Sequence, residues 1–97
     1  MSVSFDQKLA PTDDTLINVI EGESVLLNLK SESYFGLDQV GTRMWTLLTT
    51  SDSIQSAFEA LLDEYDVSAD KLRKDIQEFI EKLIANGLVE VAGEKAA

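Results

Sequence analysis

Acidic side chains are the most abundant groups in this sequence that are able to do chemistry. The 97 residues include 18 Asp and Glu but only 8 Lys and Arg. Neighbouring carboxylates can act as acid and base or hold a metal, and the densest set is Asp63, Glu64 and Asp66. A calcium loop that begins at Asp63 needs glycine at its sixth position, where the sequence has Ser68. We therefore interpret these carboxylates as a solvated helix end.

The other groups needed for catalysis are missing from the sequence. It has no histidine, the commonest general base and transition-metal ligand, and no cysteine. Serine and threonine are plentiful, but only a lysine is left to activate one of them. The five glycines are scattered, so no phosphate-binding loop is formed. The sequence thus predicts a protein that is not an enzyme and that needs no cofactor or metal.

The net charge of −10 argues against nucleic acid as a partner, because such binding depends on neutralising phosphates. Half of the basic residues do lie close together, but acidic residues alternate with them, as is typical of an ion-paired helix surface. The basic residues are Lys71, Arg73, Lys74 and Lys82, and the acidic ones are Asp70, Asp75, Glu78 and Glu81. Nothing resembles a signal peptide, and no apolar run approaches the length of about 20 residues that spans a membrane. We expect a cytoplasmic protein with no membrane partner.

Three short strands are predicted over 15–20, 24–29 and 33–37. Gly22 is able to adopt the positive φ that the first turn requires. On the second strand Val25, Leu27 and Leu29 share one face, and Leu26 and Asn28 the other. The third strand is short, holds Gly36, and lies at the edge of the sheet with no partner on its far side. A free edge is a place where another chain can pair.

Three helices are predicted to follow, beginning after Asp38, Ser53 and Ser68, which are good N-caps. The first ends near Leu48 and the third runs to Asn86, with Gly87 as its left-handed terminator. The apolar faces are Val40, Met44, Leu47 and Leu48, with Trp45 at the flank, in the first; Ile54, Ala57, Phe58, Leu61, Leu62 and Tyr65 in the second; and Leu72, Ile76, Ile80 and Leu83 in the third. Residues 88–91 are predicted to be extended.

Strands followed by helices indicate a small α+β domain, with a three-stranded antiparallel sheet and the proportions of a winged helix-turn-helix. We predict a domain over 15–91, preceded by a loosely held arm at 1–14 and followed by a tail at 92–97. Val3 and Phe5 alternate and are able to add a strand to that arm.

Phe79 suggests where a partner would bind. On a helical wheel it lies at the margin of the third helix's apolar face, between Leu72 and the polar stripe that contains Asp75. If this margin faces the free third strand, a groove forms in which an extended peptide pairs with 33–37. The competing interpretation is that Phe79 and Tyr34 simply complete the core.

The same residues resemble a known family. The run VLLNLKSESYFGLDQVGTRMWTLL, followed by EALLDEYDVS and DIQEFIEKLIANGLV, is similar to the PqqD-like proteins, which are also called RiPP recognition elements. The resemblance covers 15–91, and its order and spacing are more specific than any single motif. Asp38 replaces the family's usual asparagine. Leu88 stands where quinone-cofactor members often have tryptophan, which favours the lasso-peptide branch.

This resemblance implies that the chain binds the leader of a ribosomal precursor peptide as an added strand. The partner enzyme would be a leader protease in lasso-peptide biosynthesis, or alternatively a radical enzyme that uses S-adenosylmethionine, for which the chain would be a PqqD-type chaperone. Two different functions also fit the predicted elements: a winged-helix transcriptional regulator and a structural subunit that dimerises through its free edge. The implied peptide contacts are Val25, Leu27, Glu32, Ser33, Tyr34, Phe35, Gly36, Leu37, Leu72, Asp75, Ile76 and Phe79.

Overall fold

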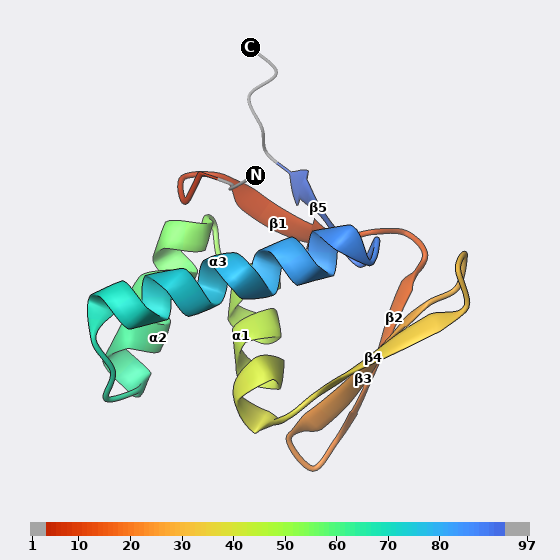
Figure 1. The fold of residues 1–97 in the computed structure, drawn as a ribbon, viewed down its shortest axis with the longest axis horizontal. Coiled ribbons are helices and arrows are strands. Elements are labelled where there is room, and N and C mark those ends of the chain that lie inside the picture. Colours follow the sequence, from red (N-terminus) through yellow and green to blue (C-terminus); the bar gives the residue numbers. More distant parts are fainter. Residues whose placement is uncertain (1–3, 93–97) are drawn as a thin grey trace.

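The computed structural model of the chain describes residues 4–92 (Figure 1). Four strands come first, then three helices and a last strand. The strands are β1 (Lys8–Pro11), β2 (Thr15–Ile20), β3 (Glu23–Asn28), β4 (Ser33–Leu37) and β5 (Val89–Ala92), and the helices are α1 (Gln39–Thr50), α2 (Ile54–Glu64) and α3 (Ala69–Ala85). The α+β class predicted from the sequence is confirmed. Within 4–92 no helix is long and apolar enough to cross a membrane.

The strands β2, β3 and β4 form the predicted antiparallel sheet, in that order. Glu21 and Gly22 both have positive φ, 54° and 86°, which suits the tight turn between β2 and β3. In β3 the buried side chains are Ser24, Leu26 and Asn28, so this face points toward the helices. Val25 and Leu27 consequently point to the opposite face of the sheet.

A second, two-stranded sheet pairs β1 with β5 in antiparallel register, from Lys8 opposite Ala92 to Pro11 opposite Val89. The arm predicted to be loosely held is therefore paired from residue 8, and Leu9 is completely buried in the core. Phe5 lies in a turn rather than in a strand, while Val3 and the predicted tail from residue 93 onward lie outside the described residues.

The arm also provides hydrogen-bond acceptors for the first turn of α2. The carbonyl oxygens of Gln7 and Phe5 accept hydrogen bonds from the backbone N–H groups of Ile54 (2.8 Å) and Gln55 (2.7 Å). These N–H groups have no partner inside the helix, so the arm replaces the missing acceptors. The Phe5 ring packs edge-on against Phe58, with the two centroids 6.0 Å apart.

All three predicted N-caps are confirmed. The side chains of Asp38, Ser53 and Ser68 accept hydrogen bonds from the backbone N–H three residues later. Gly87 ends α3 with a φ of 71°, the left-handed conformation that favours glycine.

The core lies where the helices meet the inner faces of the sheets. The predicted face of α3 is confirmed, since Leu72, Ile76, Ile80 and Leu83 are all buried. In α1 the prediction was wrong in two places. Trp45 is central, with only 4% of its surface exposed, and Val40 is 48% exposed. The reason is that α1 packs against β1 and α2 as well as β3, which rotates its buried face toward Trp45.

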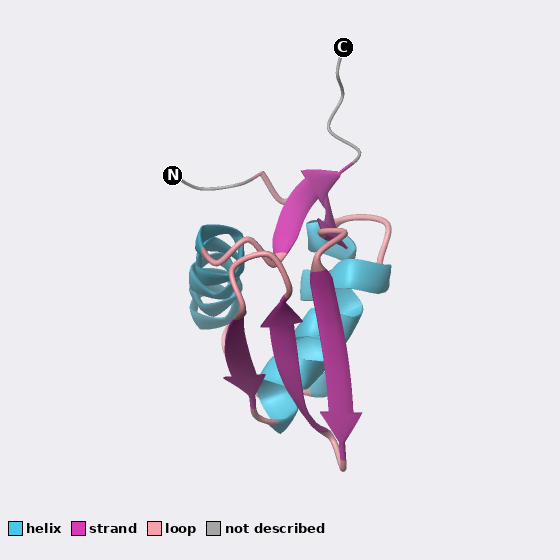
Figure 2. Ribbon diagram, turned by 90° about the vertical axis from the view of Figure 1, so that its right-hand side faces the viewer, coloured by secondary structure: helices cyan, strands magenta, loops and turns pink. Residues whose placement is uncertain are grey.

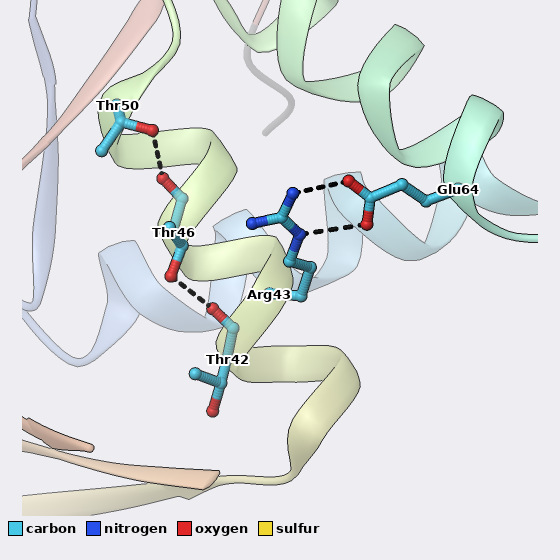
Figure 3. A network of polar contacts seen from close by, with 5 residues as sticks. All are labelled: Thr42, Arg43, Thr46, Thr50 and Glu64. Carbon is cyan, nitrogen blue, oxygen red and sulfur yellow. Dashed lines mark hydrogen bonds and ion pairs between the residues drawn. The ribbon is translucent and has the colours of Figure 1, made fainter. Parts of the chain in front are cut away.

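An ion pair joins α1 to α2 at the surface (Figure 3). Arg43 donates two hydrogen bonds to Glu64, from Nε to Oε1 at 3.0 Å and from Nη2 to Oε2 at 2.6 Å. These bonds, helped by the positive charge, hold the pKa of the Glu64 carboxyl below its ordinary value. Along α1 the hydroxyls of Thr46 and Thr50 donate to the carbonyl oxygens of Thr42 and Thr46.

We expect Glu64→Gln to lower the thermal midpoint slightly at neutral pH and to leave it unchanged in acid. Because folding lowers the pKa of Glu64, the stabilisation is present above the ordinary value of 4.5 and is lost as the pH falls through the lower folded value. Thermal unfolding of both proteins from about pH 7 to about pH 3 checks this. Glu81→Gln, at an exposed position on α3, is the control and should show no such pH dependence. If the difference in thermal midpoint between the wild-type protein and Glu64→Gln stays constant across this pH range, the stabilisation does not come from the charged Glu64 carboxylate.

Candidate functional site

The strand β4 lies at the end of the three-stranded sheet. It pairs with β3 from Ser33 opposite Asn28 to Leu37 opposite Ser24, and within 4–92 its other edge has no strand beside it. Five residues of strand present about 17 Å of backbone. In an antiparallel ladder every second residue directs its N–H and C=O away from the existing partner, so this edge offers hydrogen bonds to another chain.

A hollow of about 490 Å³ lies beside this edge and is bounded by β4, the first turns of α1, and α3. We call it the β4–α3 cleft. Apolar lining comes from Phe35, Val40, Met44 and Phe79, and charges come from Asp38, Asp75, Glu78 and Lys82; the remaining lining residues are Gly36, Leu37 and Gly41. An apolar floor with charged margins suits an extended peptide, which buries alternate side chains and keeps others in water.

A second hollow, of about 670 Å³, meets the cleft at the end of β4. The two share Gly36, Leu37 and Asp38, and the second continues to Glu21 and Glu23 at the turn between β2 and β3. The cleft is therefore open at this end rather than closed by the turn.

Asn28 connects the turn before β4 to the end of α3. Its buried side chain donates from Nδ2 to the carbonyl oxygens of Asn86 (3.0 Å) and Gly87 (3.3 Å), which end α3. Its Oδ1 accepts from the backbone N–H groups of Lys30 (2.9 Å) and Ser31 (3.2 Å), in the turn that leads to β4. One amide therefore ties together the two elements that form the walls of the cleft.

The other end of β4 is held through α1. Leu37 is buried, and Asp38 immediately caps α1 by accepting a hydrogen bond from the N–H of Gly41 at 2.8 Å. A buried hydroxyl pair, Ser24 with Thr42 at 2.8 Å, joins β3 to α1. These contacts place the first turns of α1 at the end of the cleft.

The structure brings five of the predicted site residues to the cleft: Phe35, Gly36, Leu37, Asp75 and Phe79. Phe79 is only partly buried, and Tyr34 is exposed, so the interpretation that both simply complete the core is wrong for Tyr34.

The other predicted site residues lie elsewhere. Leu72 and Ile76 are buried in the core, Ile76 completely, and neither lines the cleft. Glu32 and Ser33 are exposed at the start of β4 and do not line the hollow. Val25, Leu27 and Tyr34 lie on the opposite face of the sheet because of the register. Val25 and Leu27 were predicted to reach the pocket from the neighbouring strand, but neither lines the β4–α3 cleft; Val25 lines the adjoining hollow instead.

The sequence prediction missed the contribution of α1. Val40, Gly41 and Met44 line the cleft, as does Asp38, which had been assigned only a capping role. The sequence could have indicated this contribution of α1. Only one residue separates the end of β4 from the start of α1, so the first turn of the helix must lie beside the end of the strand. Glu78 and Lys82 of α3 also line the cleft, together with Asp75 and Phe79.

Comparison with known proteins gives a family and a fold. The family model described as coenzyme PQQ synthesis protein D (PqqD) matches residues 23–89. One similar solved structure is that of TbiB1 in complex with the TbiA(beta) leader peptide. Its sequence is 31% identical to this one, and its TM-score is 0.78, over 89% of this chain and 98% of that chain. The lasso peptide synthetase B1 complexed with the leader peptide has the same fold, with a TM-score of 0.77 at 20% identity, over 86% of this chain and 98% of that one. Among curated proteins there is no match.

Proposed function

Because the chain belongs to the PqqD family, we propose that it is a non-catalytic protein that binds the leader of a ribosomal precursor peptide in lasso-peptide biosynthesis. The leader adds to the free edge of β4 as a further strand. The protein thereby raises the concentration of the precursor at a separate enzyme, which acts on the core of the peptide. We place this activity in the cytoplasm, where the precursor is made.

One observation carries the proposal: an unpaired strand edge lies directly beside an apolar hollow. The edge of β4 supplies backbone hydrogen bonds, and Phe35, Val40 and Phe79 supply the apolar contacts. Strand addition gives affinity through the main chain and specificity through pockets for alternate side chains. The 31% identical relative, TbiB1, was solved with a leader peptide bound, which supports the same ligand class here.

The partner enzyme is, on this proposal, a leader protease. A second candidate, a PqqD-type chaperone for a radical enzyme in quinone-cofactor or other peptide modification, is favoured by the description of the matching family. Both similar solved structures are leader-peptide complexes, and one of them is named a lasso peptide synthetase, so we prefer the first candidate. The winged helix-turn-helix likeness remains a prediction, and the net charge of −10 argues against a DNA-binding regulator.

The test uses synthetic peptides that correspond to the N-terminal halves of small precursors encoded beside this gene. Isothermal titration should give a Kd between micromolar and nanomolar, about −8 to −12 kcal/mol. A scan in which each peptide N–H is methylated in turn should weaken binding by about tenfold or more at every second residue of the paired segment, because those N–H groups bond β4.

The intervening methylated positions are the internal control and should bind as the parent peptide does. A loss without this alternation would contradict strand addition. If no neighbouring precursor binds at all, the proposed function is wrong.

A further inference from the structure

The three-stranded sheet has a second surface with features of a binding site. Figure 2 shows β2, β3 and β4 side by side in front of the helices, with one face of the sheet uncovered. The register places Leu16 beside Leu27, and Leu27 beside Tyr34, on that face. We define the outer sheet face as the apolar side chains there: Leu16, Ile20, Val25, Leu27 and Tyr34.

Four of these five side chains are unusually accessible for their type. The exposed fractions are 54% for Leu16, 62% for Ile20, 44% for Val25 and 78% for Tyr34. Leu16, Val25, Leu27 and Tyr34 also surround a hollow of about 500 Å³, which Ile17 and Asn18 complete. Single exposed apolar residues are ordinary, but a contiguous hollowed patch marks an interaction site.

The neighbouring edge of β2 is also unprotected. From Thr15 to Ile20 the strand TLINVI has no charged residue and no proline. Ile17 and Val19, which point to the other face, are exposed as well, and β2 pairs only with β3 in the described part of the chain. Proteins usually block such an edge with charges, proline or a bulge, so an uncharged apolar edge beside an apolar face indicates that a partner covers it.

Charge indicates what kind of partner this is. Between Asp13 and Leu37 the acidic residues are Asp13, Asp14, Glu21, Glu23 and Glu32, and the single basic residue is Lys30. Asp14 and Glu21 flank the two ends of β2. A partner that presents apolar side chains with lysine or arginine around them complements this surface.

A second copy of the chain does not complement it. If two β2 strands paired antiparallel about their centre, Asp14 of one copy would lie opposite Glu21 of the other at both ends. Like charges directly opposite one another destabilise a strand pair. The occupant is therefore a different, more basic surface.

The outer sheet face is continuous with the site of the leader. Tyr34 belongs to β4, whose free edge receives the peptide. The hollow of about 670 Å³ runs from Gly36, Leu37 and Asp38 in the cleft to Ile20 and Val25 on the outer sheet face. A protein docked on this face lies against one end of the bound leader.

We propose that the outer sheet face and the β2 edge dock the enzyme that processes the bound precursor, through an apolar patch on that enzyme surrounded by basic residues. This inference rests on the proposed function for the nature of the partner. It adds that the leader and the enzyme occupy different surfaces of the same sheet and are bound together.

The experiment measures two affinities of each variant: for the synthetic leader, and for the purified protease-like or radical-enzyme-like protein encoded beside this gene. The double variant Leu16→Lys, Ile20→Lys should bind the enzyme about tenfold or more weakly, because it places two charges in the apolar patch along the β2 edge. Its affinity for the leader should stay within about twofold, because neither residue lines the β4–α3 cleft. Glu21→Lys, Glu23→Lys should also weaken the enzyme complex and reduce its dependence on salt.

Ile84→Lys is the matched control. Ile84 is an exposed apolar residue, at 39%, on α3, and its replacement should change neither affinity. Thermal melts followed by circular dichroism establish whether each variant folds. If the double variant does not fold, the single variant Ile20→Lys replaces it in the binding experiment.

The outcomes separate this inference from the proposed function. Enzyme binding that is unchanged in the folded variants, or absent from the wild-type protein, overturns the docking surface while leader binding stands. A wild-type dimer that Ile20→Lys dissociates also overturns it, since the occupant would then be a second copy. Failure of the wild-type protein to bind any leader rejects the proposed function instead.

Discussion

Replacing Asn28 by aspartate is expected to destabilise the folded protein by about 2–4 kcal/mol. The substitution preserves shape but removes the Nδ2 donor that bonds Asn86 and Gly87. It also places a buried negative charge 3.0–3.3 Å from two carbonyl oxygens. The free energy of unfolding in urea, compared with that of the wild-type protein, checks the prediction. Asn18→Asp, at an exposed asparagine of β2, is the matched control and should change it by less than about 0.5 kcal/mol.

The same substitution is expected to weaken leader binding beyond its effect on stability. Because Asn28 connects the turn before β4 to the end of α3, its loss releases the two walls of the cleft from each other. Titration at a temperature where the variant is fully folded isolates this effect. Unchanged leader affinity in the folded variant would show that the hydrogen bonds of Asn28 stabilise the fold without shaping the cleft.

Phe79→Ala is expected to weaken leader binding by about 10- to 100-fold, which corresponds to burying one phenylalanine, about 1.5–3 kcal/mol. Phe79 is partly exposed and forms apolar lining of the cleft on the α3 side, so a peptide paired with β4 covers it. Titration of the wild-type protein and the variant with the same synthetic leader measures the difference.

Ile84→Ala is the control for this prediction. It shortens another partly exposed apolar side chain of α3 that does not line the cleft, and leader affinity should not change. If Phe79→Ala binds the leader as the wild-type protein does, the peptide does not occupy the β4–α3 cleft. Equal losses in both variants would instead indicate a general effect of destabilising α3.

Local sequence patterns predicted the elements well because each has a local cause. Asp38, Ser53 and Ser68 cap their helices through N–H groups three residues away, and Gly87 ends α3 because it accepts a positive φ. The buried stripe of α3 follows from helical periodicity alone. The family motifs added the assignment of β4 as the peptide edge, which strand order supports.

Contacts between distant parts of the chain escaped prediction. Nothing around Lys8–Pro11 indicates a strand, because its partner β5 lies about 80 residues away and the pairing depends on both ends meeting. Trp45 was placed at the flank of α1, since a wheel of one helix carries no information about which neighbours cover it. Leu72 and Ile76 were assigned to both core and site, and the packing of α3 placed both in the core.

The sequence by itself determined the helices, their caps and the meander, because these depend on residue type and spacing within a few positions. Only the tertiary structure decided which face of the sheet each side chain occupies and which residues meet at the cleft. The reason is that strand register sets the faces of the sheet, and Asn28, which bridges the β3–β4 turn and the end of α3, joins residues up to 59 positions apart. No local pattern encodes such a distance.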